Sequence, residues 1–249
     1  MIQDSLKRIK EQLPQGVKLV AVSKFHPVER LMEAYDAGQR IFGENRPQEL
    51  AAKVPQMPQD VQWHFIGHLQ TNKLKLVLPY VSLVQSVDSL HLLEAITKWA
   101  VENNKLIDIL LELHLGAEET KHGFTEEEII QILSVVEGTP SENVDCVDPS
   151  HKWAPPSYEP RVAQFSEGVP STTSGIRVVG LMGMATNTDD MSVVEKDFIR
   201  IETLFNKLKA QYPQISELSI GMSGDWQLAV KHGATMIRIG TDIFGPREY

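Results

Sequence analysis

Lys24 is the residue whose type and position most directly suggest covalent chemistry. It follows the apolar run VKLVAVS at positions 17–23, where an ammonium group is poorly solvated. Desolvation lowers the pKa of a lysine, and a neutral amine can attack a carbonyl to form a Schiff base. The alternative is a strand that ends here, with the ammonium reaching water along its apolar stem. This stretch alone leaves both interpretations open.

Two turns of small residues near the C-terminus predict an anion site. The first is GMSGD at 221–225, between an expected strand and an expected helix, and the second is Gly240-Thr241. Small residues let backbone N–H groups approach an anion at the positive end of a helix. Alone, Ser223 would be an ordinary helix cap and Gly240 an ordinary turn. Together, after the seventh and eighth strands of a barrel, they predict a phosphate site.

Three further polar residues lie in or beside expected strands. Arg238 stands in the apolar run MIRIG and needs a partner there, because arginine is effectively always charged. Asn45 follows the second strand, where a turn or cap residue is the alternative, and His64 lies in the third, where a hydrogen-bonded core histidine is the alternative. His68 and His114 are weaker candidates. The His-x-x-x-His pair His64 and His68 begins in an expected strand rather than on one face of a helix, and no Cys-x-x-Cys spacing occurs, so we expect no metal site.

Apolar β-rich runs alternate with segments of helical period along the chain. The expected strands are 18–23, 40–43, 62–67, 82–86, 107–114, 176–182, 217–220 and 235–239. The expected helices are 28–37, 47–53, 71–78, 89–103, 125–136, 192–211 and 224–232, with an extra helix at 2–13 before the first strand.

Eight βα units in 249 residues predict an α/β fold: a single-domain (β/α)8 TIM barrel that spans residues 1–249. A doubly wound open sheet is the rival. The segment 138–175 has six prolines and no sustained period, so we interpret it as a surface insertion. Since it joins a helix to the next strand, it is expected at the bottom of the barrel, away from the ligand face.

Composition excludes several classes of protein. No apolar run approaches the ~20 residues that span a bilayer, and charges occupy the first eight residues where a secretory signal needs its apolar core. The single cysteine, Cys146, fits a reducing cytoplasm. A net charge of −9 without a dense basic run argues against nucleic-acid binding. We expect a cytoplasmic monomer.

A Schiff-base lysine on the first strand and a phosphate site on the last two strands together indicate pyridoxal 5′-phosphate. The motifs AVSK at 21–24, FGEN at 42–45, WHFIG at 63–67, GLM at 180–182, GMS at 221–223 and RIGT at 238–241 also resemble the YggS/PROSC pyridoxal-phosphate homeostasis proteins. The resemblance runs from about residue 17 to the C-terminus, interrupted by the insertion. It departs from the common pattern at Phe25-His26-Pro27 and at His114.

This resemblance implies a barrel of the alanine racemase type, with the cofactor attached as an aldimine to Lys24. It implies that Arg238 faces the pyridine nitrogen and Asn45 the ring hydroxyl, with Lys121 near the pocket mouth. Ser223, Gly240 and Thr241 would hold the phosphate. The full set of expected cofactor-binding residues is Lys24, Asn45, His64, Met222, Ser223, Gly224, Arg238, Gly240 and Thr241.

An arginine beside the ring nitrogen leaves that nitrogen unprotonated, which makes the ring a poorer electron sink. Alanine racemases add a tyrosine base from a second domain, for which we expect no room in this chain. The prediction is therefore a protein that buffers the cofactor or delivers it to apoenzymes, without efficient catalysis and without catalytic residues. A racemase-like enzyme is the main alternative, and a Schiff-base aldolase a more distant one.

Overall fold

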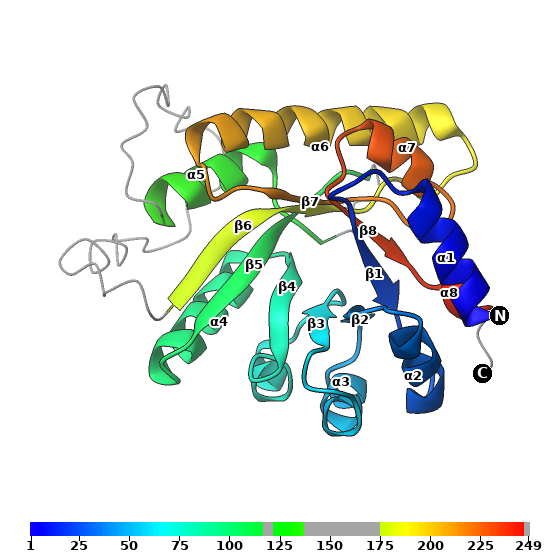
Figure 1. Ribbon diagram of the computed structural model, residues 1–249. Coiled ribbons are helices and arrows are strands. Elements are labelled where there is room, and N and C mark those ends of the chain that lie inside the picture. Colours follow the sequence, from blue (N-terminus) through cyan, green and yellow to red (C-terminus); the bar gives the residue numbers. More distant parts are fainter. Residues whose placement is uncertain (117–121, 137–174, 247–249) are drawn as a thin grey trace.

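Eight parallel strands close into a barrel in which each strand pairs with its sequence neighbours and β8 pairs with β1 (Figure 1). The computed structural model describes residues 1–116, 122–136 and 175–246. The strands are β1 (Lys18–Val22), β2 (Ile41–Glu44), β3 (Gln62–Phe65), β4 (Val81–Val87), β5 (Leu106–Leu113), β6 (Gly175–Gly183), β7 (Glu217–Ser219) and β8 (Met236–Ile239). The expected (β/α)8 barrel is confirmed, and the doubly wound sheet is excluded.

Helices cover the outside of the barrel and α1 lies beside α2 and α8 (Figure 1). They are α1 (Ile2–Gln12), α2 (Val28–Asp36), α3 (Pro47–Lys53), α4 (Leu90–Glu102), α5 (Glu126–Val136), α6 (Met191–Gln211), α7 (Trp226–Lys231) and α8 (Thr241–Phe244), with short 3-10 helices η1 (Val54–Gln56) and η2 (Thr71–Leu76). The α-helix expected at 71–78 is therefore wrong in type. A bond from the Val77 N–H to the Leu74 carbonyl has the tighter i,i+3 spacing, and Pro79 follows two residues later.

The barrel separates two apolar layers. A large cluster fills the space between the strands and the helices, and a small one of Val20, Leu83, Leu110, Met182 and Met236 fills the barrel's interior. In β8 the interior side carries Met236 and the charged Arg238, whereas Ile237 and Ile239 belong to the outer layer. The two-residue period of the strand therefore directs Arg238 into the barrel.

The carboxyl ends of all eight strands meet at one face, called the mouth below. Loops at the mouth approach one another closely: a Cβ on Gly67 would lie 2.4 Å from the Asn45 carbonyl oxygen. No side chain other than hydrogen fits there. The loop after β3 is thus held against the loop after β2, which fixes the backbone at Asn45.

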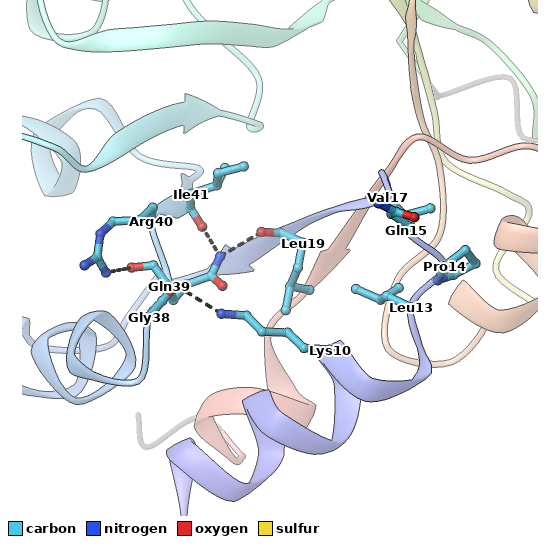
Figure 2. A pocket seen from close by; sticks show the side chains of 10 residues that line it. All are labelled: Lys10, Leu13, Pro14, Gln15, Val17, Leu19, Gly38, Gln39, Arg40 and Ile41. Carbon is cyan, nitrogen blue, oxygen red and sulfur yellow. Dashed lines mark hydrogen bonds between the residues drawn. The ribbon is translucent and has the colours of Figure 1, made fainter.

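A cavity of about 400 Å³ lies at the opposite end, between the end of α1 and the turn before β2 (Figure 2). The Gln39 amide donates to the Leu19 and Ile41 carbonyls, and the Lys10 amine donates to the Gly38 carbonyl. These bonds join the starts of β1 and β2. The cavity is therefore not part of the mouth.

Two sequence-based expectations fall on undescribed parts of the chain. The insertion at 138–175, apart from Gly175 at the start of β6, lies outside the described residues, and so does Lys121. The flanking elements, α5 and β6, agree with an αβ connection at this point. Among the described helices, none is long and apolar enough to cross a membrane.

Candidate functional site

Lys24 lies at the mouth, two residues beyond the end of β1. The preceding Ser23 is fully buried, and its N–H donates to the Gly43 carbonyl across the β1–β2 ladder. Lys24 itself is half-buried. The next residue, Phe25, has φ of 68°, a left-handed conformation that is uncommon for a side chain of this size. The chain therefore turns sharply after Lys24, and such strain persists only where the surroundings enforce it.

A buried ion pair enforces this turn. The Lys53 amine, on α3, donates to the Ser23 carbonyl at 2.9 Å and to the Glu44 carboxylate at 2.7 Å. Ser23 Oγ donates to the same Glu44 oxygen at 2.6 Å, and the Phe25 N–H donates to the Glu49 carboxylate. Lys24 is thus held between Ser23, which is hydrogen-bonded to this pair, and Phe25, which is hydrogen-bonded to Glu49, another partner of Lys53.

Glu44 is the most buried member of the group. Desolvation raises the pKa of its carboxyl, although the Lys53 charge and the bonds from Lys53 and Ser23 act in the opposite direction. Its second oxygen, Oε2, has no hydrogen-bond partner among the described residues. Glu44 therefore depends on Lys53 for the stability of its charged form.

Arg238 occupies the interior of the barrel below the mouth. Its guanidinium donates to the Ser219 carbonyl and hydroxyl, at 2.8 and 2.6 Å, and to the Gly183 carbonyl at 2.9 Å. Burial lowers its pKa to about 10, with the charges of Glu112 and Asp225 opposing the shift. At neutral pH it is a cation in fixed position, tied to the ends of β6 and β7.

His64 lies behind Arg238. Its Nδ1 is 2.9 Å from the Gln85 amide nitrogen, and the Gln85 carbonyl accepts from Ser219, the same residue that binds Arg238. His64 also lines a hollow at the N-terminal ends of the strands, beside Lys18 and Glu217. This arrangement supports the alternative of a hydrogen-bonded core histidine, connected to Arg238 through two residues.

The burial of His64 predicts a pH-dependent loss of stability. Desolvation, and then the Lys18 charge, lower its pKa from 6.5 to about 3. Between these values the unfolded chain binds a proton that the folded chain excludes, so stability falls as the pH falls. The slope is about 1.4 kcal/mol per pH unit.

We expect His64→Gln, which keeps a polar group beside Gln85, to remove this contribution. Urea unfolding of both proteins at pH 4, 5, 6 and 7 checks it. The free energy of unfolding of the parent minus that of the variant should be largest at pH 7 and should fall steadily toward pH 4. An identical pH dependence in both proteins would show that His64 titrates normally.

Asn45 presents an unsatisfied acceptor at the mouth. Its Oδ1 is buried and has no hydrogen-bond partner among the described residues. A buried amide oxygen without a partner costs about 1–3 kcal/mol. Since the Gly67 contact fixes the backbone here, the side chain is positioned to receive a donor from a ligand.

Part of the loop after β7 is already hydrogen-bonded within the protein, which the sequence did not predict. The Met222 N–H already donates to the Asp225 carboxylate at 2.5 Å, whose pKa is raised by burial. The Met222 side chain is exposed. By contrast, a Cβ on Gly224 would meet no atom within 4 Å, so this part of the loop opens on free space.

Gly240 is close to β1. A Cβ there would lie 3.3 Å from the Val22 carbonyl oxygen, tighter than most side chains tolerate. Thr241 begins α8 directly after it. The loop after β8 thus lies against the end of β1, beside Lys24. Closure of the barrel therefore brings the AVSK motif at 21–24 next to the RIGT motif at 238–241.

Glu112 is a mouth residue that the sequence-based site set omits. Its side chain lies inside the barrel near the end of β5, and desolvation followed by the Asp88 charge raises its pKa to about 7. Lys53 and Asp88 are likewise buried polar residues absent from the set. Of these three residues, only Glu112 could have been identified from the sequence, because it is a carboxylate in the apolar run LLELHL.

The arrangement combines a positioned lysine, an interior arginine, an unpaired amide oxygen and an open loop of small residues. A lysine can attack a carbonyl, an arginine and an amide can orient an aromatic heterocycle, and an open turn can accept a phosphate. These groups are the described residues on which a ligand at the mouth would depend.

Comparison with known sequences gives a consistent family. The family described as "Alanine racemase, N-terminal domain" matches residues 1–147 and 162–248. A "Pyridoxal phosphate homeostasis protein" from Vibrio alginolyticus is 31% identical, over 100% of this chain and 98% of its own. The protein of the same name from Schizosaccharomyces pombe is 32% identical, over 99% and 93%.

Solved structures agree with the sequence comparison. PipY of Synechococcus elongatus PCC7942, solved with PLP bound, superposes with a TM-score of 0.75 at 33% identity, covering 98% of this chain and 100% of its own. Alanine racemase from E. faecalis shares the fold, with a TM-score of 0.66 at 18% identity; the match covers 98% of this chain but 57% of the racemase.

Proposed function

Since this chain belongs to the pyridoxal phosphate homeostasis family, whose barrel is that of the alanine racemase N-terminal domain, we propose that it binds pyridoxal 5′-phosphate at the mouth and keeps the cofactor available to other proteins. The observation that carries the proposal is the convergence of Lys24, Arg238 and the small-residue loops on one mouth. Relatives with the homeostasis name, and the PLP-bound PipY structure, support it.

The described residues fit this cofactor. Lys24 supplies the amine for covalent attachment, and Arg238 supplies a fixed cation for the pyridine nitrogen. The unpaired Asn45 oxygen faces a donor such as the ring hydroxyl. Gly224 offers space for the phosphate, and the N–H groups of Ser223, Gly224, Gly240 and Thr241 would bind it. We place Met222 and His64 outside direct contact, because each is already bonded within the protein.

The same residues limit catalysis. The cofactor supplies a reactive aldehyde and a ring that accepts electrons when its nitrogen is protonated. Arg238 keeps its own proton at neutral pH, so it cannot protonate that nitrogen. A cofactor that is bound but poorly activated suits storage and release. We therefore propose that the protein has no efficient reaction of its own and that apo enzymes receive the cofactor from it.

Incubation with L-alanine or L-serine in deuterated water tests this function. The cofactor-loaded protein is expected to exchange no Cα hydrogen at rates near ~1 s⁻¹, the lower end of typical enzyme turnover. Proton NMR and chiral chromatography provide the measurement, with an alanine racemase as the positive control. Steady racemisation or deuterium incorporation at that rate would establish an enzyme instead.

Gly224→Asp tests the phosphate position. The site is sterically open, so the added carboxylate mainly repels the phosphate dianion. A lost or opposed bond to a charged group costs about 1.5–3 kcal/mol, so the Kd for pyridoxal 5′-phosphate should rise by more than about tenfold. Gly224→Asn is the uncharged control of similar size. Equal weakening of unphosphorylated pyridoxal would place the phosphate elsewhere.

The remaining properties are proposals from the sequence. We propose one cofactor-binding domain over residues 1–249, with an insertion at 138–175. We also propose a cytoplasmic monomer, from the single Cys146 and the net charge of −9. Size-exclusion chromatography with light scattering measures the oligomeric state.

A further inference from the structure

A cluster of two histidines and an aspartate lies at the mouth, apart from the residues assigned to the cofactor. His68 follows β3, Asp88 follows β4 directly, and His122 belongs to the connection between β5 and α5. One ligand atom from each lies within 4.8 Å of the other two. We propose that these three side chains form a binding site for a divalent transition metal ion, with zinc as its typical occupant.

Contacts within the cluster already hold the three side chains close together. His68 Nδ1 lies 2.8 Å from the Asp88 carboxylate, and the rings of His68 and His122 stack with centroids 4.8 Å apart. Asp88 is nearly fully buried, and its other oxygen accepts from the Ser89 hydroxyl at 3.1 Å. The carboxylate is therefore fixed, and the two histidines converge on it from separate loops.

The chemistry of the donors selects the class of metal. Two imidazoles and one carboxylate are a ligand set of catalytic and open zinc sites, whereas calcium and magnesium prefer oxygen alone. Two ligand atoms of a tetrahedral zinc lie about 3.4 Å apart, given bonds of about 2.0–2.2 Å. The His68 and His122 side chains are exposed, so their rings can rotate by the small amount that this separation requires.

The electrostatic surroundings favour a cation. Glu112, a buried carboxyl near the end of β5, lies close enough to the cluster for the Asp88 charge to help raise its pKa. A metal ion bound by His68 and Asp88 would offset the charge of the buried Asp88 carboxylate. It would also tie together the connections that follow β3, β4 and β5.

Zinc titration of the full-length, chelator-treated protein provides the test. Isothermal titration calorimetry with zinc chloride is expected to show a binding site in the parent. His68→Ala and His122→Ala should each weaken zinc binding by at least about tenfold, because loss of even an outer partner of a metal ligand typically weakens metal binding by about tenfold to a hundredfold. Asp88→Asn should act similarly. His91→Ala removes a histidine only three residues from Asp88 and is the matched control.

A second readout separates binding from folding. Because the ligands join three loops, saturating zinc should raise the thermal midpoint of the parent and of His91→Ala, but not of the double variant His68→Ala/His122→Ala. The circular dichroism of the metal-free variants should match that of the parent. The proposal fails if the double variant binds zinc as tightly as the parent, or if the parent binds none at millimolar concentration.

Discussion

Lys24→Ala is expected to abolish the visible absorbance band that the protein acquires with pyridoxal 5′-phosphate. The band requires a covalent link between the cofactor and an amine, and Lys24 is the half-buried lysine that the β1 turn holds at the mouth. The fold should survive, because the side chain lies beyond the strand and leaves the buried Ser23 contacts intact. Absorbance and circular dichroism of the two proteins check both parts.

Borohydride reduction identifies the attachment point directly. In the parent, reduction should fix the cofactor to the peptide that contains Lys24, as read by mass spectrometry. Lys75→Ala, which removes an exposed lysine of η2, is the control and should keep the band. Labelling of Lys121 or Lys53 in the parent, or an unchanged band in Lys24→Ala, would contradict the assignment.

The sequence predicted the barrel well because parallel strands that are buried on both faces form apolar runs. All eight strands lie within two residues of their expected ends, and only the helix at 71–78 was wrong in type. Lys24, Asn45 and Arg238 were predicted as site residues for the same reason, since each is a polar residue in or just after an apolar run.

Residues whose role depends on the third dimension escaped the sequence. Lys53 closes a helix that looks solvent-facing, yet its amine reaches across to Glu44 and the Ser23 carbonyl. The role of His64 stays a prediction, because a strand pattern does not show how far down the barrel a side chain lies, and the structure bonds its ring to Gln85. His68, Asp88 and His122 come from three separate loops, so no local spacing predicts their cluster.

These residues give the mouth a supporting layer. Arg238 is held by β6 and β7, His64 stands behind it through Gln85 and Ser219, and Lys24 is flanked by residues bonded to Lys53 and Glu49. A site supported in this way keeps its geometry without a ligand. The structure thus favours a pocket that is formed in advance.

The largest stability loss is expected for Lys53→Met. The Lys53 side chain is nine-tenths buried and the Glu44 side chain has no exposure, so removal of the amine leaves a buried carboxylate without a counter-charge. Breaking such a pair costs about 3–5 kcal/mol. The same change removes a bond to the Ser23 carbonyl, so the turn at Lys24 should loosen and cofactor attachment should weaken. Urea unfolding and the visible absorbance titration measure the two effects.

A double variant separates the lost pair from lost packing. Lys53→Met/Glu44→Leu removes both charges, and it should recover much of the stability because an apolar pair of similar volume can replace a buried ion pair. Lys98→Met is the matched control: Lys98 pairs with Glu102 at the same i,i+4 spacing, but both side chains are exposed, so a loss below about 1 kcal/mol is expected. Two outcomes would contradict the dependence of Glu44 on Lys53: a stability loss for Lys53→Met no larger than that for Lys98→Met, or a double variant less stable than Lys53→Met. The turn that positions Lys24 would then need another support.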